Sequence, residues 1–225
     1  IPIPAVGRAQ EIMMVIDHYM KSGEMVESPV FTEGMISEAS AIHESYPEYL
    51  ARELKQKILE TDDNPFDSEY FTNIEHADAR EEPMREDSPC IILATSGMLE
   101  GGPVLEYFKN IAPDKKNKVL FVSYQVNGTL GRRVLDGSKQ ATMLGKEGKV
   151  EVVTINCSVE KLDGFSGHSD YNQLMSFVQR LRPKLRRVLV NHGERSKSEN
   201  LAMNIRRMYR VPAHYPQVQE AIKLF

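Results

Sequence analysis

Residues 89–103 read PCIILATSGMLEGGP, and this stretch decides the fold class. A continuous apolar run, Pro89–Ala94, leads into the small residues Thr95-Ser96-Gly97, and Gly101-Gly102-Pro103 then begins a helical stretch. An apolar run without alternation is typical of a strand that is covered on both faces, as in a parallel sheet. The order of strand, glycine-rich turn and helix therefore predicts a unit of an α/β fold.

The same alternation continues along the chain. Further apolar runs predict strands: Val30–Thr32, Val119–Ser123, Val150–Ile155 and Arg187–Asn191. Stretches with helical spacing lie between these strands. The first follows Gly7 and ends at about Gly23, the second runs from about Ser37 to Glu60 with a break possible at Pro47, and the third begins at Gly101-Gly102-Pro103 and ends at about Ala112. The others are Gly128–Leu135, Leu174–Leu181 and Ser198–Tyr209. Residues 61–88 form an acidic connector with few aliphatic side chains. We predict the α/β class with a parallel sheet.

The charge is divided unevenly along the chain. The formal net charge is −4, but residues 1–114 hold 8 Lys and Arg against 23 Asp and Glu, whereas residues 115–225 hold 20 against 9. A basic half is suited to face a polyanion such as a nucleic acid. Solvated charged faces of an ordinary protein are the alternative.

The composition indicates an ordinary globular protein, with 41% hydrophobic and 27% charged residues. No stretch approaches the roughly 20 apolar residues of a membrane span, so no membrane partner is expected, and no signal segment opens the chain. The cysteines, Cys90 and Cys157, lie in apolar runs without a CxxC neighbour. We predict buried thiols in a reducing compartment, the cytoplasm.

Three strand-to-helix junctions carry the candidate functional residues. Ligands of α/β proteins gather beyond the carboxyl ends of strands, where helix N-termini offer N–H groups to anions. At the first junction, residues 94–103, three glycines allow the backbone to approach a ligand closely. No Gly-Lys-Ser/Thr follows, which excludes a P-loop of the nucleotide-hydrolase kind. A phosphate cradle and tight helix–strand packing both remain open.

The second junction centres on His168, within Gly164–Tyr171. An imidazole between small residues is accessible, and Asp170 is placed to orient it. Such a histidine can act as a general acid or base, or bind a metal. Alternatively, Ser169 or Asp170 caps the helix and His168 is merely exposed.

The third junction is His192, at the end of an apolar run and followed by glycine. An α/β fold places metal ligands and catalytic groups at this position, and a histidine bonded beneath a loop is the alternative. The other histidines are expected to be structural or solvated: His18, His43, His76 and His214. A catalytic metal needs about three protein ligands, and the chain has no His-x-His pair, His-Glu-x-x-His motif or cysteine cluster.

Five motifs, in this order, carry a family resemblance: Gly7-Arg8-Ala9-Gln10-Glu11; Thr95-Ser96-Gly97-Met98 with Gly101-Gly102-Pro103; Tyr124-Gln125 with Gly128-Thr129-Leu130-Gly131-Arg132; Phe165-Ser166-Gly167-His168-Ser169-Asp170; and Asn191-His192-Gly193-Glu194. The chain resembles the C-terminal half of β-CASP metallo-β-lactamase ribonucleases. It is most similar to archaeal homologues of the cleavage and polyadenylation specificity factor endonuclease.

The resemblance implies a parallel-sheet, Rossmann-like β-CASP domain over residues 1–150. Over residues 151–225 it implies the returning C-terminal segment of a metallo-β-lactamase αββα domain. It also implies that the intact protein is a zinc-dependent ribonuclease of RNA 3′-end processing or decay, with two zinc ions. In the family, the other metal ligands lie upstream of the motif that begins at Gly7. The chain alone is therefore expected to be inactive, with an incomplete zinc site.

The resemblance also assigns individual residues. His168 matches a catalytic histidine that contacts the scissile phosphate and is thought to protonate the leaving oxygen, and His192 matches a zinc ligand. Backbone N–H groups and cations are expected to hold the RNA backbone by contacts that are largely blind to sequence. These RNA- or phosphate-binding candidates are Thr95, Ser96, Gly97, Met98, Arg132, Ser166 and Gly167.

Two other functions are weighed. A non-catalytic RNA-binding or scaffold subunit of an RNA-processing complex is the main alternative, and intact His168 and His192 argue against it. A small-molecule hydrolase of the metallo-β-lactamase type would lack the inserted β-CASP domain. The apolar, strand-like tail Ala221–Phe225 suggests a covered edge. Archaeal members that the chain resembles dimerise through their C-termini, so we expect a homodimer through this tail; a tail tucked into its own sheet is the alternative.

Overall fold

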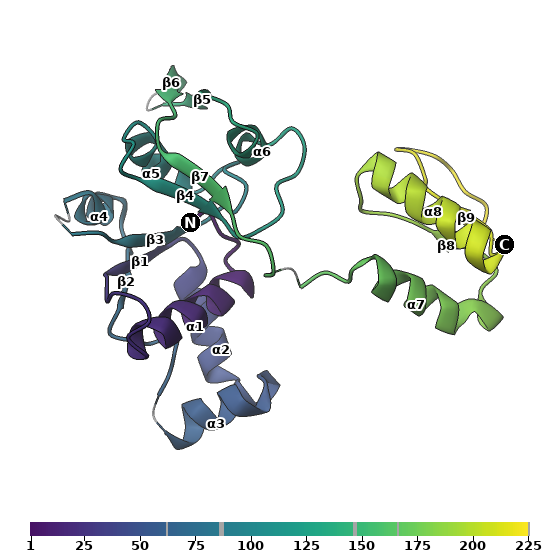
Figure 1. The fold of residues 1–225 in the computed structure, drawn as a ribbon, viewed down its shortest axis with the longest axis horizontal. Helices are drawn as coiled ribbons and strands as arrows, with labels where there is room; N and C mark the ends of the chain where they lie inside the picture. Colours follow the sequence, from purple (N-terminus) through teal and green to yellow (C-terminus); the bar gives the residue numbers. More distant parts are fainter. Residues whose placement is uncertain (62, 86–87, 146–147, 166, 225) are drawn as a thin grey trace. The chain divides into compact units, whose positions relative to one another are not determined.

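The computed structural model describes residues 1–61, 63–85, 88–145, 148–165 and 167–224. They fall into two compact units, Ile1–Ser166 and Gly167–Phe225 (Figure 1). Each unit has its own hydrophobic core. Residues 151–161 belong to the first unit, so the compact units divide later than the family-based boundary after residue 150. That boundary stays a prediction.

A parallel sheet of three strands is the centre of the first unit. Strand β1 (Val30–Glu33) lies between β2 (Phe71–Asn73) and β3 (Ile91–Ala94), and Pro2 adds an isolated parallel bridge to Ala94. The predicted α/β class is confirmed by this sheet and its helices.

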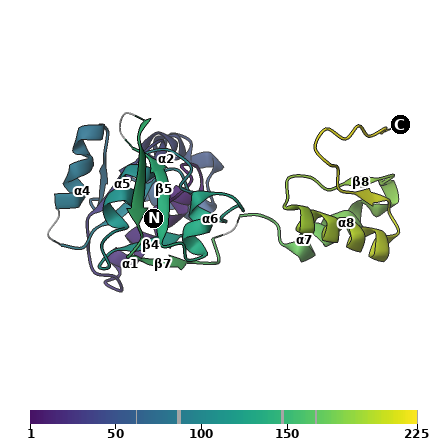
Figure 2. The same cartoon turned by 90° about the horizontal axis from the view of Figure 1, so that it is seen from above.

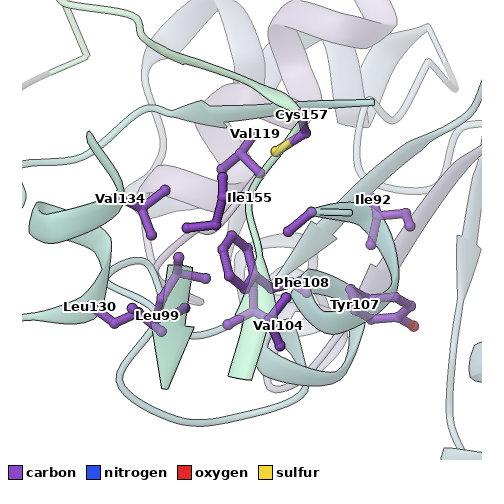
Figure 3. Packing of buried hydrophobic residues seen from close by; sticks show 14 of the residues in the cluster. Ile92, Leu99, Val104, Tyr107, Phe108, Val119, Leu130, Val134, Ile155 and Cys157 are labelled. Carbon is purple, nitrogen blue, oxygen red and sulfur yellow. The ribbon is translucent and has the colours of Figure 1, made fainter. Parts of the chain in front are cut away.

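Helices cover both faces of this sheet. Leu93 packs in the cluster formed with α1 (Arg8–Lys21), whereas its neighbour Ile92 packs in the cluster formed with α5 (Val104–Ile111), as Figure 3 shows for Ile92 and the side chains of α5. Successive side chains of a strand point to opposite faces. A strand with helices on both sides must therefore be apolar throughout, which explains the run without alternation.

The remaining strands of the first unit form two pairs. Strand β4 (Lys118–Phe121) pairs in parallel with β7 (Ser158–Lys161), and β5 (Gln140–Leu144) forms an antiparallel hairpin with β6 (Val150–Thr154). The expectation of a covered parallel strand near Val150 is wrong for β6. Only Val153 is buried in β6 because the outer face of the hairpin meets solvent.

The other helical segments of this unit are short: α2 (Ile36–Ser45), η1 (Pro47–Tyr49), α3 (Arg52–Glu60), η2 (Ala77–Glu81), α4 (Glu82–Arg85) and α6 (Leu130–Leu135). Among them, α2 and α3 divide the predicted helix of residues 37–60 at Pro47, as its missing N–H and fixed ring favour. The acidic connector is not without structure, because β2, η2 and α4 lie in it. Of the two cysteines, both described, Cys157 is buried and Cys90 is half-buried, and both are thiols.

A charge network ties the connector to two helices. Asp17 is fully buried, and Lys21 Nζ lies 2.9 Å from its Oδ1 and 2.5 Å from Asp63 Oδ1. Lys57 Nζ lies 2.9 Å from Asp63 Oδ2. Hydrogen bonds from Lys21 and Lys57 hold the pKa of Asp63 below its ordinary value.

The second unit is a small α/β unit (Figure 2). Helices α7 (Tyr171–Leu181) and α8 (Arg195–Tyr209) pack with the parallel pair of β8 (Val188–Leu189) and β9 (Ala213–His214). The tail is not the strand that we expected, because residues 221–224 have no regular structure and Arg187 Nη1 donates to the carbonyl oxygen of Lys223 at 3.1 Å. No helix in the described part of the chain is both long and apolar enough to cross a membrane.

Candidate functional site

The loop after β3 holds the first group of candidate residues. The N–H of Ser96 donates to the carbonyl oxygen of Gly101 at 3.1 Å, so this amide is occupied within the loop. Among the described residues, the N–H groups of Gly97 and Met98 have no acceptor. Backbone amides in a folded protein are nearly always paired. Gly97 is buried, and a Cβ on it would lie 2.7 Å from Pro4 Cδ, whereas Met98 is half-buried. The N–H of Met98 is therefore the amide that is suited to bind an anion.

Thr95 has a packing role. A Cβ on Gly34 would lie 2.1 Å from Thr95 Oγ1, and a Cβ on Gly102 would lie 2.6 Å from the Thr95 carbonyl oxygen. Both glycines also have positive φ, 94° and 76°, which other residues rarely adopt. Gly34 and Gly102 therefore allow the backbone and side chain of Thr95 to pack closely against the neighbouring segments.

Gln125 orients the neighbouring peptide unit from inside the fold. It is 1% exposed, and its Nε2 donates to the carbonyl oxygen of Gly97 at 2.9 Å. A trans peptide is planar, with its C=O and N–H on opposite sides. Because the Gly97 carbonyl points to Gln125, the N–H of Met98 points away from it.

Helix α6 holds the same loop from a second direction. The N–H of Gly131 donates to the Met98 carbonyl oxygen at 2.9 Å, and the N–H of Leu130 donates to the side chain of Glu100. A Cβ on Gly131 would lie 2.0 Å from Gln125 Oε1 and 2.8 Å from the Met98 carbonyl oxygen. Gln125 and Gly131 belong to the motif that carried the resemblance, but sequence reasoning gave them no role.

Arg132 follows on α6, half-exposed. Its N–H donates to the cap residue Thr129, and its Nε donates to Asp136 Oδ2 at 2.9 Å. The charge of Arg132 is therefore partly neutralised, whereas its neighbour Arg133 is exposed.

A buried carboxylate at the carboxyl end of β1 was not identified from the sequence. Glu33 is 6% exposed; it accepts a hydrogen bond from Tyr107 at 2.6 Å, and Arg80 Nη2 lies 2.6 Å from its Oε1. Burial and the hydrogen bond to Glu33 raise the pKa of Tyr107 far above its ordinary value, and the bonds to Glu33 raise the pKa of Arg80. The triad fastens η2 and α5 to the end of the sheet.

His168 is exposed, near the start of the second unit. Asp170 caps α7: its Oδ1 accepts from the N–H of Gln173 at 2.7 Å, and its own N–H donates to Gln173 Oε1 at 2.9 Å. This is the capping role weighed for Asp170, which places His168 two residues before the helix cap. Of the other candidates here, Gly167 is exposed, and Ser166 lies outside the described residues.

His192 lies in the same unit, three residues after β8. It is exposed, and its φ of 61° is in the left-handed region, which non-glycine residues seldom adopt outside functional or strained positions. Its N–H donates to Asn191 Oδ1 at 2.7 Å, and its imidazole has no hydrogen-bond partner among the described residues. The ring is thus available as a ligand.

The metal-binding capacity of this chain is limited to single ligands. In the described ranges, no group of three or more His, Cys, Asp or Glu side chains is arranged to hold a metal ion. About three protein ligands are needed for a catalytic zinc. His192 fits one position of a zinc centre, and the described residues do not fit a whole one.

Two family models match the chain in sequence order. The first is the Beta-Casp domain, over residues 9–134, and the second is the Zn-dependent metallo-hydrolase RNA specificity domain, over residues 152–216. The first match covers both the loop after β3 and Gln125, and the second covers both His168 and His192.

Similar proteins cover the whole chain. It is 82% identical over 225 residues to a transcription termination factor FttA of Cenarchaeum symbiosum, 46% identical over 224 residues to that of Pyrococcus horikoshii, and 45% identical over 224 residues to that of Methanocaldococcus jannaschii. In each comparison 100% of the chain is aligned, but only 34–35% of the relative. The chain spans about a third of the length of these curated relatives.

Proposed function

This chain belongs to the β-CASP family of metallo-hydrolases, and on that premise we propose that the complete protein is a zinc-dependent ribonuclease that hydrolyses RNA phosphodiester bonds in RNA 3′-end processing or decay. The proposal rests mainly on one observation: a Beta-Casp match is followed by a match to the RNA specificity domain of zinc-dependent metallo-hydrolases. The similar proteins are named transcription termination factors. Cutting a nascent transcript is one way in which a nuclease could serve termination.

In this proposal the loop after β3 binds a phosphate group of the RNA. The N–H of Met98 has no acceptor in the described structure, and the bond from Gln125 to the Gly97 carbonyl oxygen fixes the peptide unit that carries it, while α6 holds the Met98 carbonyl oxygen. Asp136 partly neutralises the charge of Arg132, because it accepts a hydrogen bond from the Nε of Arg132. The exposed Arg133 is therefore the better placed of the two to attract the RNA backbone. Contacts to phosphate fix the position of a strand without reading its sequence.

His168 and His192 have separate roles. His168 would act as a general acid that gives a proton to the leaving oxygen, as an exposed imidazole can near neutral pH. His192 would hold one of two zinc ions through its accessible ring. When bound, such ions neutralise charge on the phosphate and lower the pKa of a bound water.

The other zinc ligands would come from the part of the complete protein that this chain does not include. The relatives are about three times as long as the chain, so such a part exists in them. Helix α7 is consistent with further packing, because three of its apolar side chains are 38–55% exposed: Tyr171, Leu174 and Phe177. Single exposed apolar residues are common, but a stripe of them on one helix is typical of an interface.

A non-catalytic RNA-binding subunit is the second candidate, and a pair of variants separates it from the nuclease. In the complete protein, His168→Ala should lower the rate of RNA cleavage by about 10²–10⁴-fold, the usual loss for a general acid, while the zinc content stays normal. His192→Ala should lower both cleavage and zinc content.

The assay uses an end-labelled RNA, with zinc measured by elemental analysis. His18→Ala is the matched control, since His18 is exposed on α1, far along the chain from both junctions. Wild-type protein that binds RNA but never cuts it, with zinc present, would leave only the scaffold role.

A further inference from the structure

A dense group of cations lies between α7 and β8 in the second unit. Five of the eight residues from 180 to 187 are basic, and all five are exposed: Arg180, Arg182, Lys184, Arg186 and Arg187, here named the 180–187 cluster. In the described structure none of them forms an ion pair, whereas Arg195 and Lys197 of α8 pair with Glu199 and Glu194. The cluster carries an uncompensated positive charge.

The backbone beneath the cluster is fixed. The turn η4 (Arg182–Lys184) contains a proline and is closed by a bond from the Leu185 N–H to the Arg182 carbonyl oxygen at 3.2 Å. Leu185 is extended, and it packs with Val188 against the core of the unit. Because side chains alternate along extended backbone, the inward Leu185 directs Lys184 and Arg186 to solvent.

The cluster is separate from the position of His192. It precedes β8, whereas His192 follows the strand, so the two lie toward opposite ends of it. Pairing with β9 runs from Val188 to Val190, and this extended stretch carries the backbone roughly 10 Å from Arg187 before the turn at His192. The cluster would therefore hold a part of the RNA strand other than the phosphate at His192.

We propose that the 180–187 cluster is a second RNA-backbone site, which holds the strand away from the phosphate that is cut; this rests on the proposed function. The chemistry favours phosphate, because guanidinium groups bind it through paired N–H donors. The unit as a whole favours a polyanion too, since residues 167–225 hold 11 Lys and Arg against 4 Asp and Glu. An acidic protein surface is the competing partner, and stabilisation of the C-terminus of α7 by nearby cations is the structural alternative.

The test replaces two of the cations in the complete protein, as Arg182→Gln with Lys184→Gln. The control is Lys115→Gln with Lys116→Gln, an exposed pair before β4 that loses the same charge. The Kd for a labelled single-stranded RNA is measured from 0.05 to 0.3 M salt. Each phosphate contact to a single strand adds about 0.7 to the slope of log K against log salt. The double variant should lose about 1.4 of slope and bind about tenfold more weakly at 0.15 M salt, with the control unchanged.

Cleavage and stability complete the test. At saturating RNA, kcat should stay within about twofold of wild type because the cluster touches no reacting atom. The proposal is overturned if the double variant has the same slope of log K against log salt as wild type. It is also overturned if the double variant has a lower Tm but an unchanged Kd, because the cations would then serve to stabilise α7. Unchanged RNA binding with weaker binding of polyglutamate indicates an acidic protein partner instead. A wild-type protein that binds no RNA sinks the proposed function as well, an outcome distinct from the other three.

Discussion

The side-chain amide of Gln125 donates to the carbonyl oxygen of Gly97 at 2.9 Å, across 28 positions of sequence. Gln125→Met should leave that carbonyl without its partner and destabilise the fold by about 1 kcal/mol. It should also weaken RNA binding, because the N–H of Met98 loses its fixed direction. Melting curves and Kd values check both effects. Gln140→Met is the control, as Gln140 is exposed on β5; equal effects from the two changes would contradict the role of Gln125.

Removal of one hydroxyl should weaken the end of the sheet. Tyr107→Phe deletes the hydrogen bond to Glu33 and leaves that carboxylate to Arg80 alone. A hydrogen bond to a charged group contributes about 1.5–3 kcal/mol, and urea unfolding should show a loss in that range. Tyr49→Phe, at a residue 83% exposed, should change stability by less than about 0.5 kcal/mol. Equal stability of the two variants would rule out a stabilising triad.

Acid should remove the contribution that the ion pairs of Asp63 make to the stability of the fold. Its pKa in the fold is below the ordinary 3.8, so its ion pairs stabilise the fold above that pH and are lost as the pH falls through the lower, folded value. Asp63→Asn should therefore cost roughly 0.5 kcal/mol at pH 6, the usual size for a partly exposed pair, and almost nothing near pH 2. Urea unfolding at both pH values measures the difference. Asp78→Asn serves as the exposed control, and a cost for Asp63→Asn that grows in acid would refute the sign.

The isolated chain should bind no zinc tightly. His192 supplies one ligand, and about three are needed for a catalytic ion. Chelator-treated chain that is reloaded with zinc should hold well under one ion per molecule by elemental analysis. One full equivalent, lost in His192→Ala, would show that the chain builds a site that its described residues do not reveal.

The tail should support a homodimer. Leu224 is 63% exposed and Ile222 is half-exposed, so apolar surface of the tail is open to a second copy. Residues 220–223 also line an open pocket of about 440 Å³ beside β9, and His214 Nε2 lies 2.8 Å from Glu220 Oε1 of the same unit. Deletion of residues 216–225 keeps β9 and should turn a dimer into a monomer by light scattering. If the mass is the same with and without the tail, the tail serves only its own unit.

The sequence was sufficient for the class of fold but not for its smaller strands. Continuous apolar runs such as Ile91–Ala94 are typical of a strand covered on both faces, and that prediction needed no knowledge of the neighbouring strand. Strand β2 has three residues, none fully buried, and it exists because it pairs with β1, about 40 positions away. Pairing over such distances is not encoded in local periodicity. Strand β5 could have been found, since its polar and apolar residues alternate.

The candidate site was predictable to the same degree. Position alone marked His192, because strand ends collect functional groups. Its left-handed backbone was not predictable, since a strand end favours extended geometry. Glu33 lies 47 and 74 positions from Arg80 and Tyr107, and a sequence does not say which distant cation or hydroxyl will meet a buried acid.

The close packing at Gly131 also limits which substitutions this position can accept during evolution. Any side chain there meets both Gln125 and the main-chain carbonyl of Met98, so a change at 125 alone does not make room for one at 131. Divergence at these two positions would need a simultaneous shift of the loop after β3, which single nucleotide changes do not deliver. Position 131 should therefore evolve slowly in any descendant that keeps this loop, whether or not its catalysis is retained.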